Sequence, residues 1–160
     1  MIDHYSRTLT LVAAVGSAVA GGVFLAFSTF VMKALRRLPA AQGMSAMQAI
    51  NRAAPSPIFM TALFGTALVC VALGISAITR IGEDQAVYEL VGSALYLVCI
   101  VLTIAYHVPR NEALAAVDPD SQGAAAVWSR YLAEWTTWNH VRTLTAVAGS
   151  AILTVALRAG

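Results

Sequence analysis

Four long apolar stretches dominate the pattern of hydrophobic and polar positions, and the polar residues gather between them. A helix needs about 20 apolar residues to cross the hydrocarbon core of a bilayer. The stretches cover residues 8–32, 58–79, 87–107 and 141–157. Trp135 and Trp138 precede the last one, and Trp is enriched at membrane–water interfaces, so we extend that span back to residue 138. The pattern predicts four transmembrane helices.

The two longer connections, residues 33–57 and 108–137, carry short apolar repeats of their own. In residues 40–53 apolar side chains recur every three or four positions, which is typical of an amphipathic helix. A second such helix is predicted for residues 120–138, after a turn at Asp118-Pro119-Asp120. We therefore expect an all-α fold with one integral membrane domain over residues 1–160. Its core is a four-helix transmembrane bundle with short amphipathic helices in the two long loops.

Composition agrees with lipid as the surrounding solvent. The chain is 59% hydrophobic and 11% charged, whereas soluble domains are about 25% charged. This scarcity of charge excludes intrinsic disorder, nucleic-acid binding and almost any soluble globular domain. Cys70 and Cys99 each lie inside an apolar run, with no C-x-x-C spacing, so we expect neither a disulfide nor a zinc site.

The basic residues predict how the bundle is oriented. Four spans place both termini and the turn at residues 80–86 on one side, which carries Arg7, Arg80 and Arg158. The other side carries Lys33, Arg36, Arg37, Arg52, Arg110, Arg130 and Arg142. Because Lys and Arg are enriched in cytoplasmic loops, we expect residues 33–57 and 108–137 to be cytoplasmic and both termini to be outside. The expected location is the inner (plasma) membrane.

A stripe of large side chains follows the start of the last span. Its members are spaced three or four residues apart and share one helical face: Trp128, Tyr131, Trp135, Trp138 and Arg142. Thr145 and Gly149 continue this face with small side chains, so we expect it to point into the bundle. A guanidinium at the membrane edge needs aromatic or anionic neighbours. An interfacial aromatic belt with an arginine that reaches the headgroups explains the same stripe.

A polar line with the same spacing runs along the third span. It comprises Glu89, Ser93, Tyr96, Cys99 and Thr103, and ends at Tyr106 or His107. Polar groups are costly in hydrocarbon, so we expect this face to turn inward. The line can form a pocket for an amphipathic ligand, or it can supply a few hydrogen bonds between helices.

Further polar residues cluster at the predicted cytoplasmic rim. They are Asn51, His107, Asn111, Asn139, His140 and Arg142. An imidazole is a suitable base near neutral pH, and amides with a guanidinium can bind an oxyanion or enolate. On an ideal helix His140 lies about 160° from Arg142. His140 therefore joins an Arg142 site only if the helix distorts or a neighbouring helix reaches it, and either histidine can also be merely interfacial.

Cofactor binding has weaker support. His107 and His140 form at most a pair, which makes them weak metal candidates, although a bis-histidine haem site would suit a four-helix bundle. No H-E-x-x-H, P-loop, G-x-G-x-x-G or G-x-S-x-G motif occurs. We expect no cofactor, with haem or a metal ion left open.

Several segments resemble one known family. The runs at residues 26–35 and 47–51, the P-x-N-x-x-L pattern at 109–114 and the W-x-x-W-N-H-x-R pattern at 135–142 are similar to the anthrone oxygenase-like family of small four-helix membrane proteins. The resemblance covers nearly the whole chain. Arg110 departs from it, since many relatives carry a smaller or apolar residue there.

The resemblance implies that O₂ oxidises an anthrone-like or phenolic substrate without a cofactor. His140 or His107 would remove a proton, and Arg142 with Asn139 or Asn111 would stabilise the enolate. We expect this lipophilic substrate to contact Trp138, Trp135, Asn51, Tyr96, Tyr106 and Phe27. The alternatives are a non-catalytic membrane protein that binds a quinone, a lipid or a partner, including a second copy of itself, and a bis-histidine haem carrier.

Overall fold

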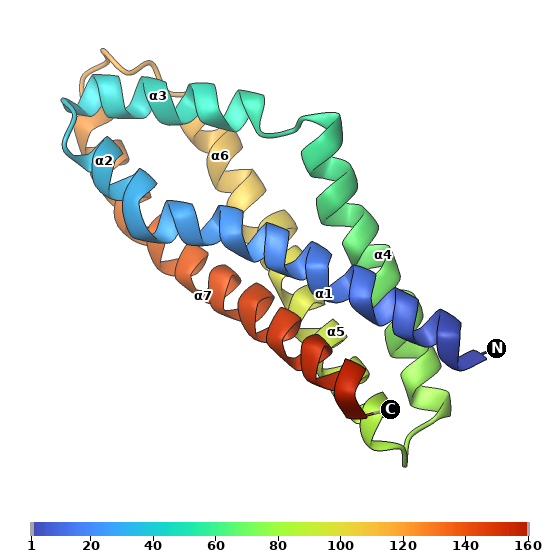
Figure 1. The fold of residues 1–160 in the computed structure, drawn as a ribbon. Helices are drawn as coiled ribbons and strands as arrows, with labels where there is room; N and C mark the ends of the chain where they lie inside the picture. The colour runs from blue at the N-terminus through green and yellow to red at the C-terminus, as the bar shows by residue number, and fades with distance from the viewer. Residues whose placement is uncertain (1, 160) are drawn as a thin grey trace.

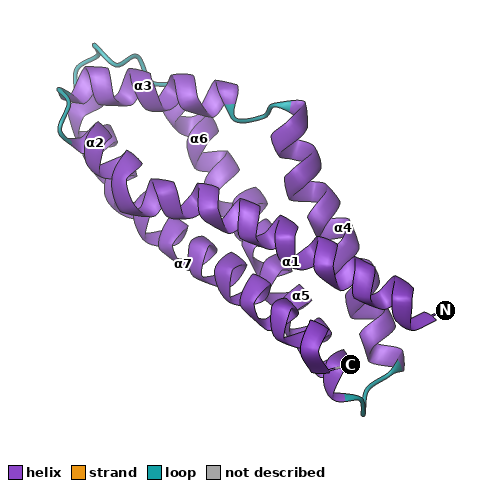
Figure 2. Ribbon diagram, viewed as in Figure 1, coloured by secondary structure: helices purple, strands orange, loops and turns teal. Residues whose placement is uncertain are grey.

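A computed structural model describes residues 2–159, with side chains from residue 5 onward, as helices joined by short turns and without a β-strand (Figure 2). The all-α prediction is confirmed. In chain order the helical segments are α1 (Ile2–Ala26), η1 (Phe27–Val31), α2 (Met32–Arg36), α3 (Ala40–Ala53), α4 (Pro57–Thr79), α5 (Asp84–Leu102), η2 (Thr103–His107), α6 (Val108–Ala115) and α7 (Ala124–Ala159). Of these, η1 and η2 are single wide turns of π-helix.

Four continuous helices are long and apolar enough to cross a membrane, as predicted. They cover Tyr5–Arg36, Pro57–Thr79, Asp84–Ala115 and Ala124–Ala159. The helix α7 has 36 residues and is therefore about 54 Å long, which exceeds the roughly 30 Å of a bilayer core. The chain is thus compatible with an integral membrane protein whose helices extend beyond the bilayer.

The amphipathic helix predicted over residues 40–53 is confirmed as α3, but the one over 120–138 is not a separate element. Residues 124–138 form the first part of the uninterrupted α7. No Gly or Pro occurs between residues 124 and 148 to end a helix. The third span also continues past its predicted end, because η2 widens the turn before Pro109, which otherwise clashes with the preceding turn of a regular helix.

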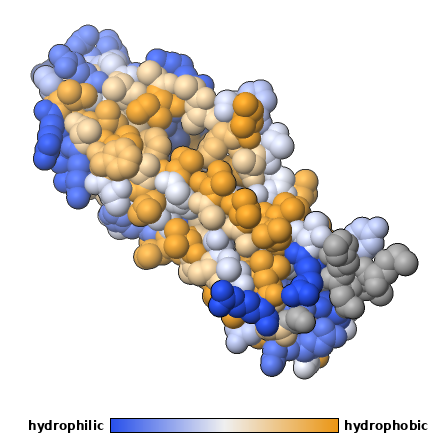
Figure 3. Space-filling view, in the orientation of Figure 1, coloured by the Kyte–Doolittle hydropathy of each residue, from blue (hydrophilic) through white to orange (hydrophobic). Residues whose placement is uncertain are grey.

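The bundle and its end can be followed in Figure 1. The helix α7 packs mainly against α1 and α5, and α4 packs against α1 and α5. Away from the termini, α4 diverges from α1, and α3 lies across this end of the molecule (Figure 1). We call this end the head; it comprises α2, α3, α6 and the part of α7 up to Trp135. The visible face is hydrophobic along its middle and more hydrophilic at both ends (Figure 3).

Two hydrophobic cores follow from this arrangement. One lies inside the bundle and includes Phe24, Leu63 and Tyr96. The other lies inside the head and includes Met47 and Trp135. The helix α7 contributes to both cores through one buried face: Trp128, Tyr131, Trp135, Asn139, Arg142, Ala146, Gly149 and Leu153.

The predicted stripe on α7 is wrong at Trp138, which is 40% exposed. Asn139, four residues after Trp135, takes the buried place instead. A helix turns 100° per residue. The positions three and four residues after Trp135 therefore flank Trp135, one on each side around the helix axis. Spacing alone did not show which of the two the neighbouring helices would cover.

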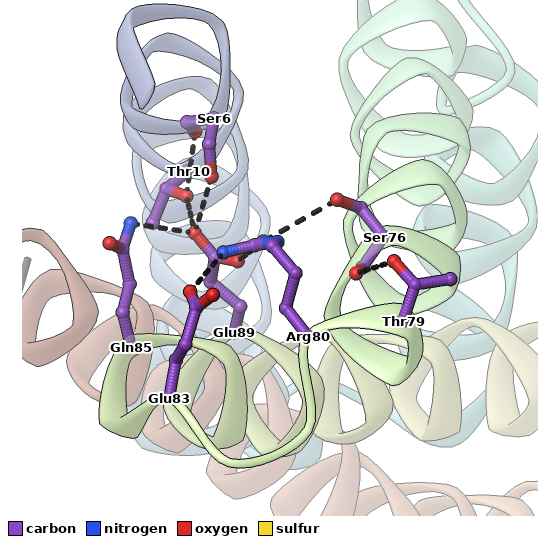
Figure 4. Close-up of polar contacts among 8 residues, drawn as sticks. All are labelled: Ser6, Thr10, Ser76, Thr79, Arg80, Glu83, Gln85 and Glu89. Atoms are coloured by element: carbon purple, nitrogen blue, oxygen red, sulfur yellow. Dashed lines mark hydrogen bonds and ion pairs between the residues drawn. The ribbon is translucent and has the colours of Figure 1, made fainter. Parts of the chain in front are cut away.

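A polar network closes the bundle at the end that holds the termini (Figure 4). The side chain of Glu89 is fully buried. Its Oε1 accepts hydrogen bonds from Ser6 (2.9 Å), Thr10 (2.7 Å) and Gln85 (3.0 Å), and its Oε2 pairs with Arg80 at 2.6 Å. This bond raises the pKa of the Arg80 guanidinium. The carboxylate therefore ties α1 to α5 and to the turn after α4.

Candidate functional site

A cavity of about 190 Å³ lies where the bundle core meets the head core. Its wall is mostly aromatic and aliphatic and comes from α1, η1, α3, α4, η2, α6 and α7. The polar lining residues are Asn51, Thr103, His107, Asn111 and Arg142. Six of the residues expected from the sequence to be catalytic or substrate-binding therefore share one cavity: Phe27, Asn51, His107, Asn111, Trp135 and Arg142.

Arg142 is the charged residue of the cavity wall and is only 6% exposed. Its Nε and Nη2 donate to Oδ1 of Asn139 at 3.2 and 2.7 Å, and its Nη1 donates to Oγ1 of Thr103 at 3.3 Å. A guanidinium has five N–H groups, so these three bonds leave one N–H free on each Nη. The Cζ atom lies 3.8 Å from the ring centroid of Phe24 and 5.4 Å from that of Trp135.

No carboxylate among residues 5–159 lies within ion-pair distance of Arg142. A buried charge without a counter-ion is costly, and aromatic rings offset this cost only in part. The free N–H groups next to an apolar cavity are donors that can bind a negatively charged oxygen.

Asn139 holds this arginine in place from behind. Its Nδ2 donates to the backbone carbonyl of Phe24 (2.8 Å) and to Oγ of Ser28 (2.7 Å). Ser28 in turn hydrogen-bonds to Thr143 at 3.0 Å. Asn139 is fully buried and is not part of the cavity wall. It contacts Arg142 instead of the cavity, which differs from its predicted role at the enolate.

Trp135 connects the groups around the cavity. Its ring lies 5.1 Å from that of His107 in an edge-to-face arrangement and 5.7 Å from that of Phe27. Its Nε1 donates to Oδ1 of Asn111 at 2.9 Å. Asn111 also accepts from the hydroxyl of Tyr131 at 2.8 Å. The indole thus contacts both an imidazole and an amide of the cavity wall.

His107 is 1% exposed and lines the cavity from η2. Its Nδ1 lies 3.0 Å from the backbone carbonyl of Leu102. A carbonyl only accepts, so Nδ1 carries the proton. Nε2 is buried and has no hydrogen-bond partner. In the neutral ring this Nε2 bears a lone pair, so His107, which lines the cavity, keeps an unpaired basic nitrogen that its neighbours cover.

His140 does not join this site. Its side chain is exposed, and it is absent from the cavity wall. The helix α7 runs without distortion past Asn139, so His140 stays on the outer face, far around the helix from Arg142. The structure therefore does not bring the two histidines together as a ligand pair in the cavity. Among the described residues, no group of three or more His, Cys, Asp or Glu side chains is placed to hold a metal ion.

Three aromatic residues predicted to contact substrate also lie outside the cavity wall. Tyr96 is fully buried and donates to the carbonyl of Leu63 at 3.0 Å, so it joins α5 to α4. Tyr106 packs against Trp138 with ring centroids 4.9 Å apart. The Cζ of Arg110 lies 3.4 Å from the Tyr106 centroid. Tyr106, Trp138 and Arg110 thus form a cluster of their own, separate from the cavity.

The structure adds a site residue that the sequence did not reveal. Phe24 lies against the guanidinium of Arg142, yet in the sequence it is one of many apolar residues of the first span. No spacing signal distinguished it. Thr103 was part of the polar line on the third span, and of that line only Thr103 and His107 reach the cavity.

Comparison with protein families gives one match. The family model described as anthrone oxygenase matches residues 57–152, more than half of the chain. The match includes His107, Asn111, Trp135 and Arg142, whereas Phe27 and Asn51 precede it. No curated protein and no solved structure matches the chain. The extent of the family match shows that the chain belongs to the anthrone oxygenase family.

Proposed function

We propose that the protein is a membrane-embedded oxygenase that uses O₂ to oxidise a lipophilic aromatic ketone with an acidic methylene group, such as an anthrone. One observation carries the proposal. A buried guanidinium without a carboxylate partner and an imidazole with a free Nε2 line the same apolar cavity. The family match supports the oxygenase class.

The first step is removal of a methylene proton. The Nε2 of His107 accepts the proton, and the electron pair left on carbon delocalises onto the carbonyl oxygen to give an enolate. The free N–H groups of Arg142 bind this oxygen. They stabilise a charge that the neutral substrate lacks, so the interaction lowers the barrier more than it strengthens substrate binding.

The second step consumes O₂. The carbanion carbon bonds to O₂, and His107 returns its proton to the resulting peroxide. Loss of the second hydrogen from the same carbon then breaks the O–O bond, forms the new C=O group and releases water. In balance, a CH₂ group and one O₂ give a C=O group and one H₂O. The substrate supplies all the electrons, so no external reductant is needed.

The cavity size determines how much of the substrate is enclosed. An engineered cavity of about 150 Å³ holds benzene, so a cavity of about 190 Å³ encloses the reacting ring of a larger system. Phe24, Phe27 and Trp135 offer aromatic surfaces for that ring. The remainder of a three-ring substrate would extend through the cavity mouth.

The test is oxidation of anthrone by the purified protein in lipid nanodiscs, under air and under nitrogen, with the rate in protein-free nanodiscs subtracted. We expect one ¹⁸O atom from ¹⁸O₂ in the quinone product. We expect His107→Ala and Arg142→Met each to reduce kcat by about 10²- to 10³-fold, with the helical circular dichroism unchanged.

His140→Ala distinguishes the two candidate bases. We expect this variant to retain activity, because its side chain lies outside the cavity wall. Loss of activity in His140→Ala but not in His107→Ala would overturn the assignment of the base. Binding of anthrone without O₂ uptake would indicate the non-catalytic alternative instead.

A further inference from the structure

A second cavity, of about 210 Å³, adjoins the first between α3 and α6. Asn51, Pro55, Val108 and Asn111 line both cavities and form the neck between an inner and an outer cavity, in which the two amides are the polar groups. Gln48, Arg52 and Glu112 line only the outer one. The inner cavity is largely apolar, whereas the outer one is bordered by side chains that can form hydrogen bonds.

Existing hydrogen bonds fix which atoms of the neck remain free. The Nδ2 of Asn51 donates to the hydroxyl of Tyr131 at 3.4 Å, which leaves its Oδ1 as an unused acceptor. The Oδ1 of Asn111 accepts from Tyr131 and from Trp135, which leaves its Nδ2 as an unused donor. The neck therefore offers one acceptor and one donor.

The outer cavity adds further acceptors. The Nε2 of Gln48 donates to the carbonyls of Leu114 and Val117, both at 2.9 Å. This orientation leaves Oε1 of Gln48 free. Arg52 and Glu112 are exposed and carry opposite charges, and no ion pair joins them. Their formal charges cancel, so the outer cavity does not favour a charged ligand.

We propose that the outer cavity is a second subsite, which binds a neutral, hydroxyl-bearing substituent of the ligand whose ring lies in the inner cavity. A hydroxyl both donates and accepts. It can donate to Oδ1 of Asn51 or Oε1 of Gln48 and accept from Nδ2 of Asn111. Each charged alternative meets one like charge at this cavity, Glu112 for a carboxylate and Arg52 for an ammonium group. This proposal rests on the proposed function in one respect only, which is that the part of the ligand in the inner cavity is an aromatic ring.

The test compares two probes of equal size, 2-(2-hydroxyethoxy)naphthalene and 2-propoxynaphthalene. Binding to the protein in nanodiscs is followed by naphthalene fluorescence anisotropy, and partition into protein-free nanodiscs is subtracted. We expect the hydroxylated probe to bind about tenfold more tightly, because its hydroxyl satisfies polar groups that the propyl group leaves without a partner. Equal affinity of the two probes for the wild-type protein would overturn the proposal.

Two variants locate the effect. We expect Asn51→Leu to abolish the preference. Because the preference is a ratio of two affinities, a change in ring binding that affects both probes equally cancels. Glu112→Ala, a surface substitution, is expected to reduce the preference about threefold, because the Glu112 carboxylate borders the same cavity and is a further acceptor for the hydroxyl. The matched control is Glu134→Ala, because Glu134 is also exposed and lines neither cavity. A preference that survives in both Asn51→Leu and Glu112→Ala would contradict the subsite.

The binding measurement does not depend on turnover. If the preference is absent while anthrone is still oxidised, the subsite fails and the proposed function stands. If the preference is present but no O₂ is consumed, the proposed function fails and the subsite stands.

Discussion

Asn139 accepts two hydrogen bonds from Arg142 on a single oxygen, from Nε at 3.2 Å and from Nη2 at 2.7 Å. A carboxylate is the usual partner for such a two-pronged contact. Here a neutral amide fixes the guanidinium and leaves its positive charge uncompensated. The pairing orients Arg142 toward the cavity without reducing its attraction for an anion.

Asn139→Asp tests this relationship, because it places a negative charge at nearly the same position. We expect the variant to bind 2-naphthoate at least tenfold more weakly than the wild type and to oxidise anthrone about 10- to 100-fold more slowly, since the new carboxylate neutralises Arg142. Isothermal titration in nanodiscs measures the first effect. Ser28→Ala is the control, because it removes a partner of Asn139 and leaves both bonds to Arg142 intact. Undiminished naphthoate binding by Asn139→Asp would refute the role of the uncompensated charge.

Glu89→Ala is expected to destabilise the fold without a direct effect on the cavity. The substitution leaves Arg80, Ser6 and Thr10 without their shared acceptor, and loss of a buried, hydrogen-bonded carboxylate costs about 2–4 kcal/mol. Thermal unfolding in mild detergent measures this loss. Glu83→Ala removes an exposed partner of the same arginine and should cost less than about 1 kcal/mol. Equal effects of the two substitutions would contradict the importance of the buried pair.

Gly149→Ala tests the close contact between α5 and α7. A Cβ atom at Gly149 would lie 2.9 Å from the carbonyl oxygen of Gly92, which is backbone and cannot rotate away. We expect a loss of about 1–3 kcal/mol in the free energy of unfolding. Gly74→Ala is the matched control, because no atom lies within 4 Å of its added Cβ, and its stability should stay within about 1 kcal/mol of the wild type. A neutral Gly149→Ala would show that the two helices can separate at low cost.

We expect the head to face the cytoplasm. It and the turn after α2 carry Lys33, Arg36, Arg37, Arg52, Arg110 and Arg130, whereas the opposite end carries Arg7, Arg80 and Arg158. The native Cys70 and Cys99 are buried, so a maleimide is expected to react only with an added cysteine. Labelling then shows on which side of the membrane the added cysteine lies. A membrane-impermeant maleimide should label Ala159→Cys in intact cells and should label Ser121→Cys only after permeabilisation. The reverse pattern would invert the orientation.

The membrane helices were predictable from local sequence, because a run of apolar side chains long enough to span a bilayer has few stable structures other than a membrane-spanning helix. The helix α3 was also predictable, since its apolar positions recur at the helical period and prolines follow it. The continuity of α7 was harder to see. Turn-forming residues precede it, but no Gly or Pro separates its polar part from its apolar part, so the two parts form one helix.

The candidate site was only partly predictable. Asn51, Asn111 and Arg142 stood out because polar side chains are rare in this chain, and the structure places all three at one cavity. Sequence spacing could not decide between His107 and His140. Spacing also placed Trp138 on the inward face of the helix, because it shows which residues share a helical face but not which face a neighbouring helix covers.

Local sequence accounts for the four apolar helices, the helix α3 and the small set of polar residues available for chemistry. Each depends on the transfer of side chains between water and lipid, or on the local helical period. Long-range packing, by contrast, places His107 inside and His140 outside, and pairs Arg142 with an amide instead of a carboxylate. Those outcomes depend on how α1, α5 and α7 rotate and pack against one another, which arises from contacts between residues far apart in the chain.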